Sequence, residues 1–327
     1  PAMSTRQTYD HKAHKNGDRK AFQENSVMLI IGGATATGKS ELAIQLAKKF
    51  NGEIISADSM QIYKGMDKGT AKINEEEKEG IPHHLIDVVE PDQSFSVADF
   101  KEMADNIVAD VKARAKLPII VGGTGLYINS LIYDYKLSDN NPRLREELNK
   151  EYEKFGADYM YEKLAKFDPL SAEKIHRNNV KRVIRALEVY LTTRKSIHDK
   201  ADKQNFVPHL MYAINYPREI LYARINERVE KMFASSLVEE VKCLIDKGYG
   251  FDLQSMQAIG YKEFKEYFAG KITLEETKEL IKQHTRNYAK RQETWFKRID
   301  TCKWLNFNEK ERFAEIISND ITDSNLI

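Results

Sequence analysis

Cysteine is scarce in this chain, and long apolar runs are missing. The two cysteines, Cys243 and Cys302, lie far apart and have no Cys or His neighbours at metal-ligand spacing. A disulfide scaffold and a zinc site are therefore not expected, and a reducing cytoplasm is the favoured compartment. No apolar run approaches the roughly 20 residues that a membrane-spanning helix needs, and no secretory leader is visible. We expect a cytoplasmic protein that does not enter a membrane.

An excess of either charge sign is also missing. The 51 Lys and Arg residues nearly balance the 50 Asp and Glu residues, giving a net charge of +1. Overall charge therefore indicates no partner, and only local clusters of charge can do so. The length of 327 residues and the 41% hydrophobic content fit one large globular domain or two small ones. Residues 1–27 are polar without apolar periodicity, which predicts a disordered tail or an added extension.

Strand-like and helix-like segments alternate between residue 28 and about residue 137. Short apolar runs predict buried strands, and apolar residues at helical spacing predict helices between them. The strands are expected at 27–31, 53–57, 84–89 and 117–121, and the helices at 40–50 and 96–111. This alternation predicts an α/β fold with a doubly wound parallel sheet.

A phosphate-binding loop follows the first predicted strand. Residues 33–40 match the pattern G-x-x-x-x-G-K-[ST] between a strand and a helix. Such a loop turns backbone N–H groups toward one anion, and the helix N-terminus adds partial positive charge. Lys39 supplies a charge for the terminal phosphate, and the Ser40 hydroxyl suits Mg²⁺. The loop consists of Gly33, Ala34, Thr35, Ala36, Thr37, Gly38, Lys39 and Ser40. It predicts a bound diphosphate or triphosphate but does not identify the reaction.

Later segments complete the predicted organisation. Residues 138–204 are helical and strongly charged, one more strand is expected at 207–215, and 218–299 is helical. We therefore predict a P-loop NTPase-like catalytic core made of 28–137 and 205–305. A helical insertion domain, 138–204, interrupts this core. Residues 306–327 are expected to be a C-terminal tail or a weakly packed helix.

Two polar segments follow other buried strands. Asp58 begins the sequence Asp-Ser-Met-Gln after the second strand, and ligands in doubly wound sheets bind at the carboxyl ends of strands. A carboxylate there could ligate a metal, act as a general base or simply cap a helix. Thr124 is the only hydroxyl among the glycines 122, 123 and 125, which could admit a ligand or only form a turn.

Positive charge is concentrated in two places. Residues 171–200 contain eight Lys or Arg against three acids, and residues 281–298 contain six against one. In the second cluster Lys282, Arg286 and Lys290 share a helical face, while a face with Ile281, Tyr288, Trp295 and Ile299 is assigned to the core. Such clusters can neutralise the phosphates of a nucleic acid, although a solvated helix face is the usual alternative.

These motifs occur in an order that resembles the tRNA dimethylallyltransferase (isopentenyl-tRNA transferase) family. The matching strings are GGATATGKS (32–40), ISADSMQIYKGMDKGTAK (55–72), PHHLID (82–87), FSVADF (95–100), LPIIVGGTGLY (117–127), DPLSAEKIH (168–176), KRVIRALEV (181–189), QAIGYKEF (257–264) and YAKRQETWF (288–296). The resemblance covers nearly everything from 28 to about 305 and is of the bacterial type, since a C-terminal Cys/His zinc finger is missing. Departures are small: Gly-Ala replaces the commoner Gly-Pro at 33–34, Ser40 replaces Thr, and Arg177 stands where Pro is frequent.

The resemblance implies transfer of a dimethylallyl group from dimethylallyl diphosphate to N6 of adenosine 37, beside the anticodon of tRNA. It implies that Asp58 accepts an N6 hydrogen, that Thr124 lies near the reaction centre and that Arg228, less certainly Arg224, stabilises the leaving diphosphate. Mg²⁺ on Ser40 is the implied cofactor, and the family is generally monomeric. Contacts with tRNA are implied for Asp58, Ser59, Met60, Gln61, Thr124, Arg145, Lys181, Arg182, Val183, Ile184, Arg185, Gln257, Gly260 and Tyr261. The charge pattern adds Arg286, Lys290 and Arg291.

Three other functions keep the same phosphate-binding loop. A small-molecule kinase would turn over ATP, but it does not explain the two basic clusters. An adenylate prenyltransferase acting on free nucleotides needs no surface for a tRNA. A non-catalytic RNA-binding protein with a vestigial loop is disfavoured by the intact Lys39, Ser40 and Asp58.

Overall fold

The computed structural model describes residues 27–133, 141–198 and 206–323. The tail predicted for 1–27 lies outside the described residues except for Val27. None of the helices in these three ranges is both long enough and apolar enough to cross a membrane. The described chain divides into two compact units, one within 1–95, 103–125 and 208–327, the other within 96–102 and 126–207.

A parallel sheet forms the centre of the first unit, as the sequence predicts. Its strand order is β3-β2-β4-β1-β5-β6, and every neighbouring pair is parallel. The strands are β1 (Met28–Gly33), β2 (Gly52–Ser56), β3 (His83–His84), β4 (Leu117–Val121), β5 (His209–Asn215) and β6 (Cys302–Asn306). β1, β2 and β4 are buried along their whole length. The apolar runs of β1 and β4 suit a strand covered on both faces, whereas β2 also buries Glu53 and Ser56. The predicted α/β fold class is confirmed.

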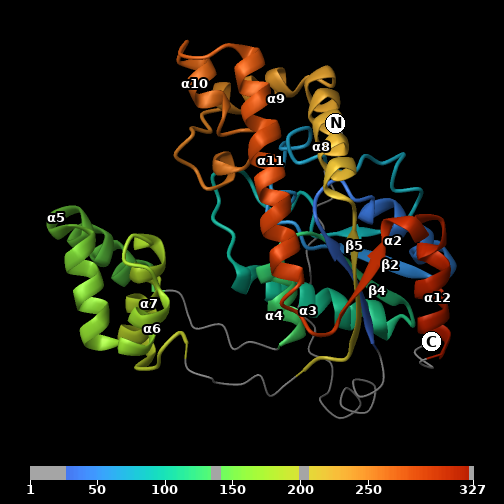
Figure 1. Cartoon of the computed structure of the whole chain (residues 1–327), viewed down its shortest axis with the longest axis horizontal. Coiled ribbons are helices and arrows are strands. Elements are labelled where there is room, and N and C mark those ends of the chain that lie inside the picture. Colours follow the sequence, from blue (N-terminus) through green and yellow to red (C-terminus); the bar gives the residue numbers. More distant parts are fainter. Residues whose placement is uncertain (1–26, 134–140, 199–205, 324–327) are drawn as a thin grey trace, which may run out of the picture. The chain divides into compact units, whose positions relative to one another are not determined.

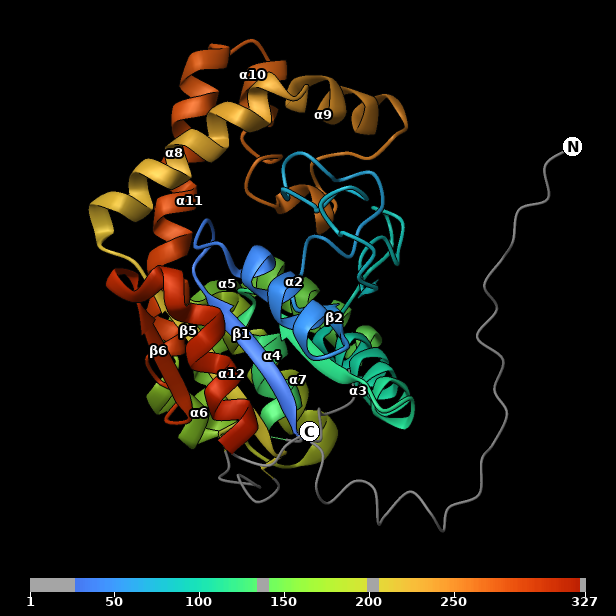
Figure 2. The ribbon, with the colours of Figure 1, turned by 90° about the vertical axis from the view of Figure 1, so that its right-hand side faces the viewer.

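Helices α2 (Lys39–Lys49) and α12 (Phe313–Asp323) contribute to the apolar core on one face of this sheet (Figure 2). Helices α8 (Arg218–Ala234) and α11 (Leu274–Phe296) pack against each other and extend beyond the carboxyl ends of the strands (Figures 1 and 2). Helix α9 (Leu237–Asp246) contacts α8, and helix α10 (Phe264–Phe268) contacts α11. Short 3₁₀ helices occupy Ser255–Gln257 and Phe307–Arg312. Helices α3 (Val97–Ala113) and α4 (Gly125–Ile132) each have residues in both units.

The second unit contains a small helical core. It is built from α5 (Pro142–Phe167), α6 (Pro169–Lys174) and α7 (Val180–Thr193), and its buried residues include Leu148, Met160, Leu164 and Leu187. Asn141 and Asn179 cap α5 and α7 by accepting backbone N–H groups. The predicted insertion, 138–204, falls within this unit, although 138–140 and 199–204 lie outside the described residues.

Two predictions about the edges of the sheet are wrong. The strand expected at 84–89 is reduced to His83–His84, with only an isolated bridge from Val89 to Tyr63. The last residues are not a weakly packed tail, because β6 pairs with β5 and α12 buries Phe313, Ile317 and Ile321 in the sheet core. These three residues lie four apart, which places them on one face of a helix.

Candidate active site at the carboxyl end of the sheet

The phosphate-binding loop connects β1 to α2 and is held by bonds within the loop. The Thr37 hydroxyl donates to the Ala34 carbonyl at 2.8 Å, and the Lys39 ammonium donates to the same oxygen at 2.5 Å. Gly38 precedes α2 in a left-handed conformation and gives the helix no side-chain cap. The first N–H groups of α2 therefore remain available to an anion, as the motif predicts.

Two charged groups, Arg228 on α8 and Asp58 after β2, act on Lys39. Burial, together with the Arg228 charge, lowers the pKa of Lys39 to about 7, whereas the Asp58 carboxylate raises it. Burial also lowers the pKa of Arg228, against the influence of Asp58. Two cations and one carboxylate thus share the surroundings of the phosphate-binding loop. An anion bound there would stabilise the charged form of Lys39.

Arg224 approaches the loop from α8 as well. Its Nε donates to the Ala36 carbonyl at 2.8 Å, and its guanidinium lies 5.3 Å from the centre of the Tyr216 ring. Arg224 therefore fixes the outer turn of the loop, while Arg228 acts electrostatically on Lys39 and Asp58. Both arginines named by the sequence lie beside the loop, and their roles differ.

Asp58 follows β2 and organises the segment that comes after it. Its Oδ1 accepts the backbone N–H groups of Met60 at 2.8 Å and Gln61 at 3.3 Å. Asp58 therefore does cap a turn, although no helix begins there. Because a single oxygen serves the turn, the second oxygen of the carboxylate can accept a hydrogen from a substrate.

The Gly-Gly-Thr-Gly segment after β4 lies next to the Asp58 segment. The Thr124 N–H donates to the Ala57 carbonyl at 3.2 Å, and the Thr124 hydroxyl accepts the Ser59 N–H at 3.1 Å. These bonds bring together two segments that the sequence places on separate strands, because β2 and β4 are neighbours in the sheet. Thr124 therefore lies beside the Asp58 segment, and the charge of Asp58 acts on Lys39 of the phosphate-binding loop.

Two residues of α11 that the sequence analysis did not select complete this group. Gln292 is buried; its side-chain oxygen accepts the Thr35 N–H at 2.9 Å and its amide donates to the Gly123 carbonyl at 3.2 Å. Burial and the Asp58 carboxylate raise the pKa of the Tyr288 hydroxyl to about 12, against hydrogen bonds with Thr124 and Gln292 that lower it. Tyr288 is half-buried, so it does not belong to the fully buried core that the sequence predicts for it. The signal that could have found both residues is the string 288–296, which resembles the family.

Helix α11 also packs closely on the glycines of the β4 segment. A Cβ on Gly123 would lie 2.0 Å from the Gln292 amide, and a Cβ on Gly125 would lie 2.1 Å from the Trp295 ring. Such separations are far below van der Waals contact, so the segment needs glycine at both positions to meet α11. The glycines thus permit close approach by the protein itself.

Most residues that are expected to contact tRNA, from the resemblance or from the charge pattern, fall into two groups. Lys181, Arg182, Gln257, Lys290 and Arg291 are exposed, and Ser59, Met60, Gln61 and Arg286 are half-buried. By contrast, the side chains of Val183 and Ile184 belong to the core of the second unit, and Tyr261 and Gly260 are buried in the first. The second group can support a binding surface but presents no side chain to a partner.

Several cations of the two basic clusters, together with Arg145, are held by partners within the protein. Arg145 and Arg185 both form ion pairs with Glu188, whose side chain is fully buried. Lys282 bridges Glu230 and Glu279, and Arg286 donates to the Asn226 side chain at 2.7 Å. These partners reduce the charge that the clusters can offer to phosphates.

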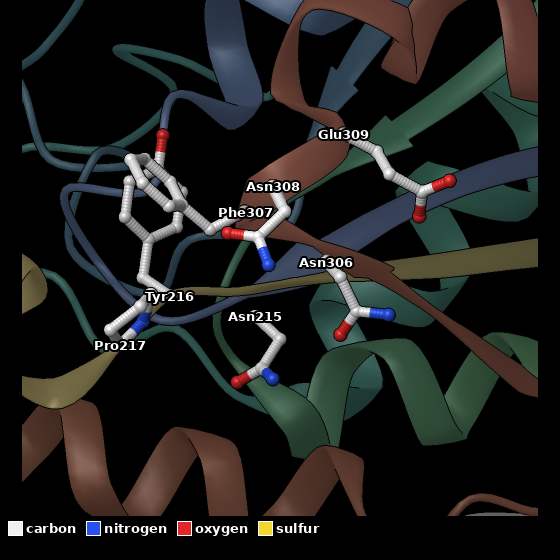
Figure 3. Close-up of a pocket in the computed structure, with 7 residues that line it drawn as sticks. All are labelled: Asn215, Tyr216, Pro217, Asn306, Phe307, Asn308 and Glu309. Atoms are coloured by element: carbon white, nitrogen blue, oxygen red, sulfur yellow. The ribbon is translucent and has the colours of Figure 1, made fainter.

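A surface hollow of about 480 Å³ lies at the carboxyl ends of β5 and β6 (Figure 3). Its lining residues are Asn215, Tyr216, Pro217, Asn306, Phe307, Asn308 and Glu309. The residues that carry charge and hydroxyl groups are instead grouped around the ends of β1, β2 and β4. The hollow is linked to the phosphate-binding loop through Tyr216, whose ring lies 5.3 Å from the guanidinium of Arg224.

A metal ion would find few ligands from this chain. Among the described residues, no three His, Cys, Asp or Glu side chains are grouped as a metal site. Ser40 is exposed at the first turn of α2, beside the end of the phosphate-binding loop. One hydroxyl at that position fits Mg²⁺, which is commonly held by one or two protein oxygens together with substrate phosphates and water.

The fold and this site define a P-loop-like α/β enzyme whose phosphate-binding loop faces a carboxylate, a hydroxyl and buried cations. Comparison with known proteins identifies the family within this class of enzymes. Residues 61–299 match the family model of the IPP transferases, and the chain belongs to this family.

Similar proteins cover almost the whole chain. A tRNA dimethylallyltransferase from Thermoanaerobacter sp. (strain X514) is 52% identical over 300 residues, which are 89% of this chain and 95% of that relative. The structure of a tRNA isopentenylpyrophosphate transferase from Staphylococcus epidermidis matches with a TM-score of 0.67 at 48% identity, covering 91% of this chain and 99% of the other. A eukaryotic dimethylallyltransferase acting on tRNA matches with a TM-score of 0.80 at 33% identity, covering 91% of this chain and 80% of the other.

Proposed function

We propose that this protein transfers the dimethylallyl group of dimethylallyl diphosphate to N6 of adenosine 37 of tRNA, releasing diphosphate. The family and the names of its relatives support the reaction class. The observation that carries the assignment of residues is the grouping of Arg228 and Asp58 around Lys39 of the phosphate-binding loop. It couples a site for an anionic leaving group to a group that can accept a proton.

In this proposal the phosphate-binding loop holds the diphosphate. Backbone N–H groups at the start of α2 and the charges of Lys39 and Arg228 would stabilise the oxygens as negative charge develops on them. Ser40 would be the ligand from this chain for Mg²⁺, which when bound would neutralise further charge on the leaving group. Arg224 would keep the outer turn of the loop in place through the Ala36 carbonyl.

Asp58 would act on the acceptor base. The N6 lone pair attacks the first carbon of the dimethylallyl group while the bond from that carbon to the diphosphate oxygen breaks. The bonding electrons leave with the diphosphate, and an N6 proton passes to the Asp58 carboxylate. Thr124 and Tyr288 would hold the base beside Asp58 through their hydroxyl groups. A base inside the anticodon stack could not reach this site, so we expect adenosine 37 to be extruded.

Exposed basic residues would contact the tRNA backbone. Lys181 and Arg182 on α7 and Lys290 and Arg291 on α11 are the side chains that we select. We expect each charge removed to lower the dependence of tRNA affinity on salt, since each neutralised phosphate releases counterions. We further propose that the enzyme acts as a monomer in the cytoplasm.

One assay tests the proposal. The full-length protein is incubated with Mg²⁺ and labelled dimethylallyl diphosphate, and with either an anticodon stem-loop carrying three consecutive adenosines or free AMP. We expect label in the stem-loop, and we expect Asp58→Ala to abolish it. Label in AMP alone would assign the protein to the adenylate prenyltransferases. No transfer to either acceptor, together with ATP turnover, would favour a kinase.

A further inference from the structure

The segment that follows Asp58 is held from outside by one carboxylate. Glu240 on α9 accepts the backbone N–H groups of Asp67 at 3.1 Å, Lys68 at 2.8 Å and Gly69 at 3.3 Å. Three consecutive N–H groups therefore converge on a single side chain, an arrangement otherwise suited to an anionic ligand. Figure 2 shows the segment that contains residues 67–69 alongside the chain that follows α9.

Tyr261 forms hydrogen bonds with both Glu240 and the same backbone segment. Its hydroxyl donates to Glu240 at 2.6 Å and accepts the Gly69 N–H at 3.1 Å. A Cβ on Gly69 would lie 2.3 Å from the Tyr261 ring, so only glycine allows this contact. We name Glu240, Tyr261 and the backbone of 67–69 the Glu240 clasp.

The Glu240 clasp continues into the residues beside Asp58. The Thr70 carbonyl, directly after the clasped backbone, accepts a hydrogen bond from the Gln61 side-chain amide at 3.3 Å. The oxygen of that amide accepts the Ser56 hydroxyl at 3.2 Å, so both ends of the Gln61 side chain are held. The Gln61 N–H in turn donates to Asp58. Three links thus join Glu240 to the carboxylate proposed to act on the acceptor base.

The buried ammonium group of Lys72 also holds this segment through bonds to residues inside and beside it. The Lys72 ammonium donates to the Tyr63 carbonyl at 2.8 Å and forms ion pairs with Asp67 and Asp87. Its side chain is only 4% exposed. The segment from 63 to 72 is therefore tied internally by Lys72 and externally by Glu240. Such ties reduce the conformational freedom that binding would otherwise have to remove.

We propose that Glu240 is a positioning residue, which holds the segment 58–70 in the conformation that presents Asp58 and Gln61 to the acceptor base. This inference rests on the proposed function. It also gives Gly260 and Tyr261 a role that suits their burial: they support the base-binding segment from behind. Glu240 itself touches no reacting atom.

The test compares neighbouring glutamates of α9. Glu240→Gln keeps the shape of the side chain but sets an amide N–H against N–H donors, whereas Glu239→Gln changes an exposed residue of the same helix. Each full-length variant is tested for dimethylallyl diphosphate affinity, for kcat and KM with the stem-loop, and for amide hydrogen exchange. We expect Glu240→Gln to lower kcat about tenfold or more, because displaced catalytic groups are costly. We expect Glu239→Gln to match the wild type.

Two readouts separate positioning from general loss of structure. The Kd of dimethylallyl diphosphate should stay within about twofold in Glu240→Gln, since the phosphate-binding loop makes none of these bonds. Amides of 66–72 should exchange faster in Glu240→Gln than in Glu239→Gln. Tyr261→Phe, which keeps the ring and loses the hydroxyl, should give a smaller effect of the same kind. Combining it with Glu240→Gln should add little.

Equal kcat values for Glu240→Gln and Glu239→Gln would overturn the positioning role. An equal loss of diphosphate affinity and kcat in Glu240→Gln would also overturn it, because the damage would then not be confined to the acceptor side. A wild-type protein that labels no acceptor would contradict the proposed function. In that event the exchange measurement would still show whether Glu240 holds residues 66–72.

Discussion

Gln292 accepts a hydrogen bond from the backbone N–H of Thr35, a residue 257 positions earlier in the chain. The same side chain donates to the Gly123 carbonyl. One buried amide on α11 therefore joins the phosphate-binding loop of β1 to the Gly-Gly-Thr-Gly segment of β4. This amide therefore holds the phosphate-binding loop beside the segment that contains Thr124.

Replacing Gln292 by glutamate should weaken diphosphate binding. A carboxylate can still accept the Thr35 N–H, but it faces the Gly123 carbonyl without a hydrogen and adds negative charge beside an anion site. We expect the Kd of dimethylallyl diphosphate to rise about tenfold or more at neutral pH, by calorimetry. Gln283→Glu, which changes an exposed glutamine of α11, is the matched control. Equal affinities for the two variants would contradict the joining role of Gln292.

Diphosphate binding should depend on pH through Lys39. Its pKa of about 7 in the free protein must rise when an anion binds, so the complex holds more protons than the free protein above pH 7. Affinity is therefore greatest below pH 7 and falls as pH rises toward the pKa of the complex. At pH 8, calorimetry in buffers of different ionisation enthalpy should show uptake of up to about one proton.

Two variants test the assignment of this proton to Lys39. Lys39→Met should bind dimethylallyl diphosphate more weakly and take up no proton at pH 8. Arg228→Ala removes a charge that lowers the Lys39 pKa, so this pKa should rise in the free protein and proton uptake at pH 8 should decrease. Proton uptake by Lys39→Met equal to that of the wild type would assign the titration to another group.

Asp58 has two functions that substitutions can separate. Asp58→Asn keeps an oxygen for the N–H groups of Met60 and Gln61 but removes the proton acceptor, whereas Asp58→Ala removes both. We expect Asp58→Asn to lower kcat with the stem-loop about 10²–10⁴-fold, with normal exchange of the Met60 and Gln61 amides. Asp58→Ala should also accelerate that exchange. An active Asp58→Asn enzyme would show that Asp58 positions the base without accepting its proton.

The sequence predicts those parts of the site that are determined by short segments of the chain. The phosphate-binding loop, Asp58 and Thr124 each follow a buried strand, and parallel strands bring their carboxyl ends to one edge of the sheet. Tyr288 and Gln292 lie on a helix, where spacing alone assigns an aromatic residue to the core. The role of Gln292 depends on contacts with Thr35 and Gly123, and that of Tyr288 depends on contacts with Thr124 and Gln292. Thr35, Gly123 and Thr124 are distant from α11 in sequence and become its neighbours only when α11 packs on the sheet.

The outer strands of the sheet, β3 and β6, also could not be predicted from the local sequence. β6 buries only Leu305 along its length, so its sequence carries little of the apolar signal of a strand. β3 is only two residues long, and neither of them is fully buried. Strand pairing at both edges is therefore decided by tertiary contacts, whereas β1 and β4 follow from apolar runs.

Stability measurements should show that the C-terminal helix is part of the core. Phe313 is 5% exposed and packs in the sheet core, so Phe313→Ala should lower the free energy of unfolding by about 3–5 kcal/mol. Asn319→Ala, at an exposed position of α12, should change it by less than about 0.5 kcal/mol. Both tryptophans, Trp295 and Trp304, belong to the unit that contains the sheet, so tryptophan fluorescence in urea follows this unit. Equally small changes in the two variants would restore the weakly packed tail that the sequence predicts.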